Sequence, residues 1–203
     1  MTRRCNMPIC LALVVITATP ALSSRSKDEA EKIAKLKAAF LLNFMKFSEW
    51  PEDSFKDDDS PILLTVYGAD TIGTALDQTL TDRAVHGRTI VIHRALPPVR
   101  NHYKKPEEYR AALSATMDRL RQSHVVLLAG LEEESTQHLI NSVADAPVLL
   151  VGDGQQYVKS QTMLDLVKNE GRIRIYANRE ALEESQVKVS SRLLKLAVLV
   201  GEK

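Results

Sequence analysis

The hydrophobic pattern is densest near the start of the chain, in the segment KAAFLLNFMKFSEWP, residues 37–51. Three of its aromatic residues recur at i, i+4 and i+7 and therefore share one face of a helix: Phe40, Phe44 and Phe47. Pro51 disfavours helical geometry at Trp50, so we expect the helix to end near Glu49. We interpret it as the first core helix. The alternative is a helix that binds a partner or lies on a membrane.

Apolar runs and helical periodicity alternate along the rest of the chain. Strands of a parallel sheet are predicted at 62–67, 88–94, 124–129 and 148–151. The near-continuous apolar run of 62–67 indicates burial on both faces. Helical spacing predicts the helices between them: 71–80, 106–122 and 132–144. Two further short runs, 163–168 and 172–177, flank Asn-Glu-Gly and predict a hairpin. Helices are expected at 179–185 and at 191–200, the latter packing Leu193, Leu194, Ala197 and Val198 inward. The chain is therefore predicted to be an α/β protein with one mostly parallel twisted sheet, flanking helices and a C-terminal antiparallel hairpin.

The first residues have the layout of a secretory signal peptide. Two arginines follow Met1, an apolar run spans residues 9–16, and Ala21 and Ser23 supply small residues before a cleavage site. We expect residues 1–23 to be removed, which leaves a single domain over 24–203. The prediction is an exported protein that is not stably inserted in a membrane. Both cysteines, Cys5 and Cys10, lie in the removed part, so the mature chain has no thiol or disulfide chemistry.

The net charge of the chain does not indicate a nucleic acid as its partner. The whole chain has 27 basic and 26 acidic residues. Removal of residues 1–23 takes away two arginines and no acid, so the mature chain is almost neutral. Nucleic-acid-binding domains normally carry a clear basic excess.

The loops after the parallel strands are where an open α/β sheet binds ligands. The candidate ligand loop consists of Gly68, Asp70, Gly152, Asp153 and Gly154. Gly152-Asp153-Gly154 resembles half of a phosphate loop but lacks the third glycine, so a plain turn is the competing interpretation.

No pattern predicts catalysis, a metal site or a cofactor. The five histidines lack the spacing of a zinc site, and no Gly-x-Ser-x-Gly segment is present. Ser191 and Lys195 are four residues apart, which does not support a Ser-Lys nucleophile. Asp153 and Asp165 would form a carboxylate pair only by coincidence of the fold. We therefore expect a binding or regulatory protein rather than an enzyme, with a hydrolase of unfamiliar site as the remaining alternative.

Three segments resemble the YfiR-like family of bacterial periplasmic proteins: KAAFLLNFMKFSEWP, GRTIVIHR and GRIRIYANREALEESQVKVSSRLLKLA. The resemblance extends over residues 37–200. It implies a regulator that binds the periplasmic sensor domain of an inner-membrane diguanylate cyclase and represses it, which lowers cyclic di-GMP and disfavours biofilm. It also implies a homodimer. It supplies no catalytic residues.

The chain departs from this family in three places. Family members carry disulfides, whereas this mature chain has no cysteine, so redox sensing is not expected. The segment Gln161–Leu164 stands where the family has a Gly-Gly step, which predicts a less open backbone. The segment 97–122 is also longer than is typical for the family.

Partner contact is expected at two places along the chain. The candidate residues are Trp50, Pro51, Lys188, Ser191, Arg192 and Lys195. The alternative function is a periplasmic small-ligand-binding component of a histidine-kinase or transport system, which predicts a pocket near Gly68, Gly130 and Gly152.

Overall fold

The computed structural model describes residues 21–201. The helices are α1 (Ala21–Lys46), α2 (Thr74–Leu80), α3 (Pro106–Arg121), α4 (Glu133–Val143), α5 (Arg179–Glu184) and α6 (Ser191–Leu194). The strands are β1 (Ser48–Glu49), β2 (Ile62–Gly68), β3 (Ala84–Val85), β4 (Arg88–Ala95), β5 (Val125–Ala129), β6 (Leu149–Asp153), β7 (Leu164–Asn169), β8 (Arg172–Asn178), β9 (Lys188–Val189) and β10 (Val198–Val200). Three 3-10 turns, η1 (Glu52–Ser54), η2 (Arg100–His102) and η3 (Gln155–Lys159), lie in the connections.

One mixed sheet organises the fold, with the strand order β10-β8-β7-β6-β5-β2-β4-β3. The pairs β4–β2, β2–β5, β5–β6 and β6–β7 are parallel, and β7 pairs with β8 as an antiparallel hairpin. The α/β class, the parallel sheet and the C-terminal hairpin are thereby confirmed. The central strands β5 and β6 are buried along their whole length, as their unbroken apolar sequences predict.

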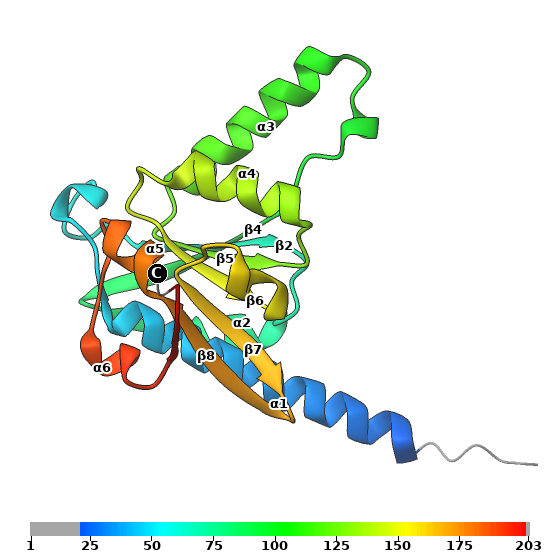
Figure 1. Ribbon diagram of the computed structural model, residues 1–203, viewed down its shortest axis with the longest axis vertical. Helices are drawn as coiled ribbons and strands as arrows, with labels where there is room; N and C mark the ends of the chain where they lie inside the picture. The colour runs from blue at the N-terminus through cyan, green and yellow to red at the C-terminus, as the bar shows by residue number, and fades with distance from the viewer. Residues whose placement is uncertain (1–20, 202–203) are drawn as a thin grey trace, which may run out of the picture.

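Helices cover both faces of the sheet (Figure 1). On one face, α1 and α2 pack on a core cluster that includes Phe44, Leu64 and Val151. On the other face, α3 and α4 pack on a second cluster that includes Tyr67 and Leu139. The opening helix is the core helix that its periodicity predicts, because Phe44 is fully buried and Phe40 and Phe47 pack against the same cluster.

The ends of two predicted helices are wrong. The first helix ends at Lys46, and Ser48–Glu49 instead pairs antiparallel with β9. The last helix ends at Leu194, and Val198–Val200 forms a parallel strand beside β8. The antiparallel hairpin leaves β8 with an unpaired edge, and these β-branched and apolar residues supply its partner. Consequently Val198 is 44% exposed rather than packed inward, whereas Leu193 is buried as expected.

The long α3 segment extends away from the body of the molecule together with the loop 96–105 (Figure 1). Only Met117 and Leu120, both in the C-terminal half of α3, are buried. The N-terminal half is therefore held by few tertiary contacts. The segment 97–122, which the resemblance suggests is longer than is typical for the family, includes this projection.

The predicted signal peptide lies almost wholly outside the described residues. Cleavage after Ser23 would remove the first three residues of α1. Its removal stays a prediction.

Candidate functional site

The candidate ligand loop lies at the carboxyl ends of β2 and β6, and β5 lies between these two strands. The connection after β2 packs directly against the end of β5. The amide of Ala69 donates a hydrogen bond of 2.8 Å to the carbonyl oxygen of Ala129. Gly68 has φ of 102°, and a Cβ there would lie only 2.1 Å from that same oxygen. Glycine is therefore required at this position for close backbone packing, and the loop is closed at that point.

Both carboxylate oxygens of Asp153 contact other side chains of the same chain. Its Oδ1 lies 2.5 Å from Nζ of Lys37, with exposed side-chain fractions of 2% and 13% respectively. The hydroxyl of Thr71 donates to the other carboxylate oxygen of Asp153. The carboxylate therefore joins α1 to the end of β6. The neighbouring Gly154 has φ of 139° and forms the turn into η3, as the plain-turn interpretation expects.

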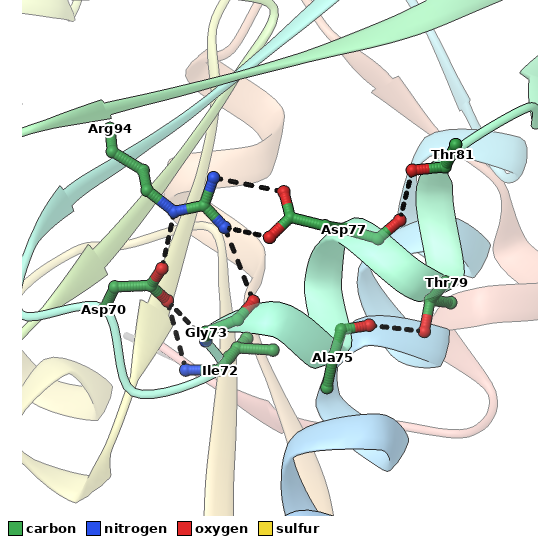
Figure 2. Close-up of polar contacts among 8 residues, drawn as sticks. All are labelled: Asp70, Ile72, Gly73, Ala75, Asp77, Thr79, Thr81 and Arg94. Carbon is green, nitrogen blue, oxygen red and sulfur yellow. Dashed lines mark hydrogen bonds and ion pairs between the residues drawn. The ribbon is translucent and has the colours of Figure 1, made fainter.

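Asp70 belongs to a network of ion pairs centred on Arg94 (Figure 2). Arg94 Nε donates to Asp70 Oδ2 at 2.6 Å, and its terminal nitrogens donate to both carboxylate oxygens of Asp77 at 3.1 and 2.8 Å. The other oxygen of Asp70 accepts from the amides of Ile72 and Gly73. These contacts lower the pKa of Asp70 despite its partial burial. The network connects the start of α2 to β4 and leaves little free hydrogen-bonding capacity for a ligand.

Asp165 is a buried carboxyl on β7. It faces Gly152 of β6 and lies close to Tyr157, so that a Cβ at Gly152 would clash with both side chains. Desolvation raises the pKa of Asp165 to about 7, although a hydrogen bond with Thr162 opposes this. Asp153 pairs in register with Leu166, one position further along. Because side chains alternate across a strand, the two carboxyls lie on opposite faces of the sheet and do not form a catalytic pair.

The contacts of Asp165 are those of a neutral carboxyl. Thr162 Oγ1 lies 2.6 Å from Asp165 Oδ1 and 3.0 Å from the carbonyl oxygen of Tyr157. A hydroxyl has one proton and can donate to only one of them. If Asp165 is protonated it donates to Thr162, which then donates to Tyr157, and both bonds form. Asp165 Oδ2 has no hydrogen-bond partner within the described residues. A buried ionised carboxylate with an unpaired oxygen would carry a large desolvation cost, which a neutral carboxyl avoids.

Gln161 and Thr162, which stand where the resemblance leads us to expect two glycines, lie next to this buried carboxyl. Thr162, the partner of Asp165, is itself buried. Gln161 has φ of 60°, the left-handed conformation that glycine adopts without strain. The backbone therefore keeps a glycine-like geometry, contrary to the expectation of a less open backbone, and the second position supplies a hydroxyl in place of a hydrogen atom.

This geometry predicts that Asp165→Asn stabilises the protein at high pH. The folded state holds a proton on Asp165 up to about pH 7, whereas the ordinary pKa is 3.8, so the native carboxyl destabilises the fold as pH rises through that window. We expect the variant to gain about 1–3 kcal/mol in free energy of unfolding at pH 8. The gain should vanish near pH 4. Urea titrations at both pH values measure it, with exposed Asp118→Asn as control. An equal change at both pH values would contradict a neutral Asp165.

The Trp50-Pro51 corner is an internal anchor. The indole nitrogen of Trp50 donates to the carbonyl oxygen of His124 at 3.0 Å, and the Phe55 ring stacks on the imidazole with centroids 4.3 Å apart. Arg88 in turn lies 3.8 Å above the Phe55 ring. Trp50 and Pro51 are both half-buried, so most of the corner is directed at the chain itself. Sequence reasoning missed this role, because His124 is 74 residues away.

His124 is held neutral at the centre of this anchor. Its Nδ1 accepts from the amide of Leu63 at 3.0 Å, so Nε2 carries the proton and donates to the carbonyl oxygen of Ser54 at 3.1 Å. Burial lowers the pKa of this imidazole, and the charge of Arg88 lowers it further. Both ring nitrogens are used in hydrogen bonds to the backbone, so His124 has a structural role.

The other candidate partner residues are exposed. Lys188, Ser191, Arg192 and Lys195 all lie on or beside β9 and α6. Beside them, Leu196, Val198 and Leu199 are exposed apolar side chains. We refer to these seven residues as the C-terminal surface. Residues 188–200 contain no acidic residue, and Glu183 is the acidic residue that lines a cavity together with Lys188 and Leu199.

Cavities lie on either side of the C-terminal surface. One, of about 590 Å³, is lined by residues that include Leu182, Lys188 and Leu199. The other, of about 440 Å³, is lined by residues that include Phe40, Leu196 and Val198. Exposed apolar groups beside hollows are typical of surfaces that bind another protein.

Among residues 21–201, no group of three or more His, Cys, Asp or Glu residues could hold a metal ion. Within the same range, no helix has the length and apolar character that crossing a membrane requires. The acidic segment 57–59 instead turns around Arg88, which donates to the carbonyl oxygens of Asp57 and Asp58.

These features define an α/β protein whose polar clusters join its own elements and whose exposed apolar residues gather at the sheet edges, as in binding proteins. The chain belongs to the YfiR/HmsC-like family, whose model matches residues 34–198. Members of this family are in general periplasmic, and they regulate cyclic di-GMP signalling rather than catalyse a reaction.

The comparison with solved structures finds a similar chain in the crystal structure of a conserved domain protein from Vibrio cholerae. The two chains share 15% sequence identity with a TM-score of 0.47, over 68% of this chain and 54% of the other. The chain thus corresponds to about half the length of that protein. A comparison with curated proteins gives no match.

Proposed function

We propose that this protein is a periplasmic repressor that binds the sensor domain of an inner-membrane diguanylate cyclase and so lowers cyclic di-GMP. The observation that carries the proposal is the family match over residues 34–198. The predicted signal peptide supports the compartment, since the sensor domain of such a cyclase faces the periplasm.

The C-terminal surface is the proposed contact with the sensor domain. It combines exposed leucine and valine side chains with the cations Lys188, Arg192 and Lys195, without an acidic residue between them. Such a surface suits a partner with an apolar centre and an acidic rim, because apolar burial supplies affinity and charge complementarity supplies orientation. The internal role of Trp50 makes the corner at residues 50–51 the weaker of the two candidate contacts.

A homodimer is the second proposed use of apolar surface at this edge. β10 is the last strand of the sheet, so its outer edge has no strand partner in the described chain. Unpaired edges with exposed apolar residues favour association with another strand. Sedimentation of the wild type and of Val198→Lys measures this, and a wild type that stays monomeric would exclude it.

The cellular test measures cyclic di-GMP after deletion and after overexpression of the gene. Deletion should raise the concentration and overexpression should lower it. The effect of deletion should disappear when the responsible cyclase is deleted too. Unchanged cyclic di-GMP in both directions would exclude the proposed function.

A binding test addresses the surface itself. We expect Lys195→Glu to weaken binding to the isolated sensor domain by about tenfold or more, which corresponds to about 1.4 kcal/mol. The control is Lys56→Glu, an equivalent charge reversal at an exposed loop residue outside the C-terminal surface. Equal binding by the two variants would exclude the C-terminal surface as the contact.

A further inference from the structure

The opposite edge of the sheet carries a second surface that the proposed function does not use. β3 pairs only with Arg88 and Thr89 of β4. Beyond them, β4 pairs with β2 on one side, and residues 90–95 have no strand partner on the other side. An edge of this length presents unpaired backbone donors and acceptors that an added strand could use.

A cleft lies against this edge, between α3 and the sheet. One cavity of about 560 Å³ is lined by residues that include Thr65, His93 and Arg119. A second, of about 440 Å³, lies under the loop after β4 and is lined by residues that include Pro97 and Tyr103. Leu96, Thr116 and Arg119 line both cavities, so the two form one continuous cleft along β4 and α3.

The face of β4 that borders the cleft is only partly covered. Val91 and His93 are exposed, and they lie on the side of the sheet that α3 and α4 cover elsewhere. Leu96 and Val99 continue the apolar surface, with 74% and 50% exposed. Figure 1 shows α3 extending away from the body of the molecule. The exposure of Val91 and His93 shows that this face of β4 is only partly covered.

The charge of the cleft is one-sided. No aspartate or glutamate is among the residues that line either cavity. Arg94 is neutralised by Asp70 and Asp77, but Arg119 forms no ion pair within the described residues. His93 and His102 add two imidazoles to the same lining. A ligand that carries carboxylates next to apolar groups is the complement of this surface.

We infer that the cleft binds an extended acidic segment of another protein, which adds as a strand to residues 90–95 of β4 and places a carboxylate against Arg119. Main-chain hydrogen bonds along β4 hold the added segment. Its alternate side chains enter the cleft, where apolar ones meet Leu96 and acidic ones meet Arg119 and His93. This site is at the other edge of the sheet from the C-terminal surface, so it exists independently of the proposed function.

The test uses a fluorescent peptide of about eight residues in which glutamate and valine alternate, which matches the two-residue period of a strand. A peptide of alternating lysine and valine is the charge-reversed control. Fluorescence anisotropy with the whole protein measures both. We expect binding of the acidic peptide only, and weaker binding as salt is raised. Equal binding of both peptides, or no binding of the acidic one, would overturn the inference.

Arg119→Glu is the deciding variant, and Arg110→Glu is its matched control. Both arginines are exposed residues of α3. They are nine positions apart, which places them on opposite sides of a helix with 3.6 residues per turn. We expect Arg119→Glu to weaken the acidic peptide by about tenfold or more, and Arg110→Glu to change it less than about twofold. Similar affinities for the two variants would overturn the inference.

Leu96→Ser tests the apolar half of the cleft. Leu96 is 74% exposed, so the variant is expected to fold like the wild type, and a thermal melt checks this directly. We expect this variant to weaken the acidic peptide as well. The cleft could instead be occupied by a second copy of this chain, and sedimentation of Leu96→Ser and Arg119→Glu tests this. Loss of self-association in both variants would identify the second copy as the occupant and would overturn the inference. Binding of the sensor domain should be unchanged in both variants, so failure here and failure of the proposed function are distinguishable.

Discussion

Replacement of Lys37 by methionine is expected to lower the free energy of unfolding by about 3–5 kcal/mol. Lys37 on α1 lies 2.5 Å from Asp153 at the end of β6, and both side chains are almost fully removed from water. Without the ammonium group, the carboxylate keeps the cost of its desolvation and loses its counter-charge. Among the described residues, the hydroxyl of Thr71 is then its remaining hydrogen-bond partner. Urea unfolding with linear extrapolation measures the change.

Lys35→Met is the control for this experiment. Lys35 pairs with Glu31 at the same distance of 2.5 Å, but these side chains are 55% and 62% exposed. An exposed pair contributes about 0–1 kcal/mol, so the control should unfold almost like the wild type. The double variant Lys37→Met with Asp153→Leu should recover much of the lost stability, because it removes both buried charges. Equal effects of the two lysine substitutions would contradict the burial argument.

Phe44→Ala is expected to lower the free energy of unfolding by about 3–5 kcal/mol, through lost apolar burial and the cavity that remains. Phe44 is fully buried in the cluster between α1 and the sheet. Phe40 is the comparison, one helical turn earlier, with ring centroids 6.4 Å apart. It is only partly buried and borders a surface cavity.

We therefore expect Phe40→Ala to cost clearly less than Phe44→Ala, although both remove the same atoms. Guanidinium unfolding of the two variants gives the ratio. Similar losses would mean that the two rings share the core equally, which would contradict the difference in exposure.

The predicted core was largely correct because burial requires a recognisable pattern of apolar residues in the sequence. A strand buried on both faces must be apolar throughout, and β5 and β6 are. A helix with one buried face must repeat apolar residues at helical spacing, as Phe40, Phe44 and Phe47 do. The parallel sheet then follows from the alternation of such strands with helices.

The C-terminal segment shows where this reasoning fails. Helical spacing is shared by Leu193, Leu194, Ala197 and Val198. Of these four residues, Leu193 and Leu194 belong to a helix and the other two do not. Short apolar runs are compatible with either structure. The unpaired edge of β8 decides the outcome, since it offers hydrogen bonds along a whole strand to Val198–Val200.

The candidate ligand loop shows a similar limit. Its glycines and acids were identified correctly as residues at the ends of strands, but their partners come from distant parts of the chain. Asp70 meets Arg94, which is 24 residues away. Asp153 meets Lys37 of the opening helix. No local pattern indicates that these carboxylates are already paired, so sequence alone leaves the ligand interpretation open.

The sequence by itself determined most of the core helices and strands, the class of fold and the family resemblance, because periodicity and characteristic segments are local properties of the chain. The tertiary structure decided what each polar and aromatic residue does. It gave Trp50 an internal hydrogen bond to His124, and it left Leu96 and Arg119 exposed beside an unpaired strand edge. Such roles depend on which groups meet across the fold and which remain in water, and the order of residues does not encode either directly.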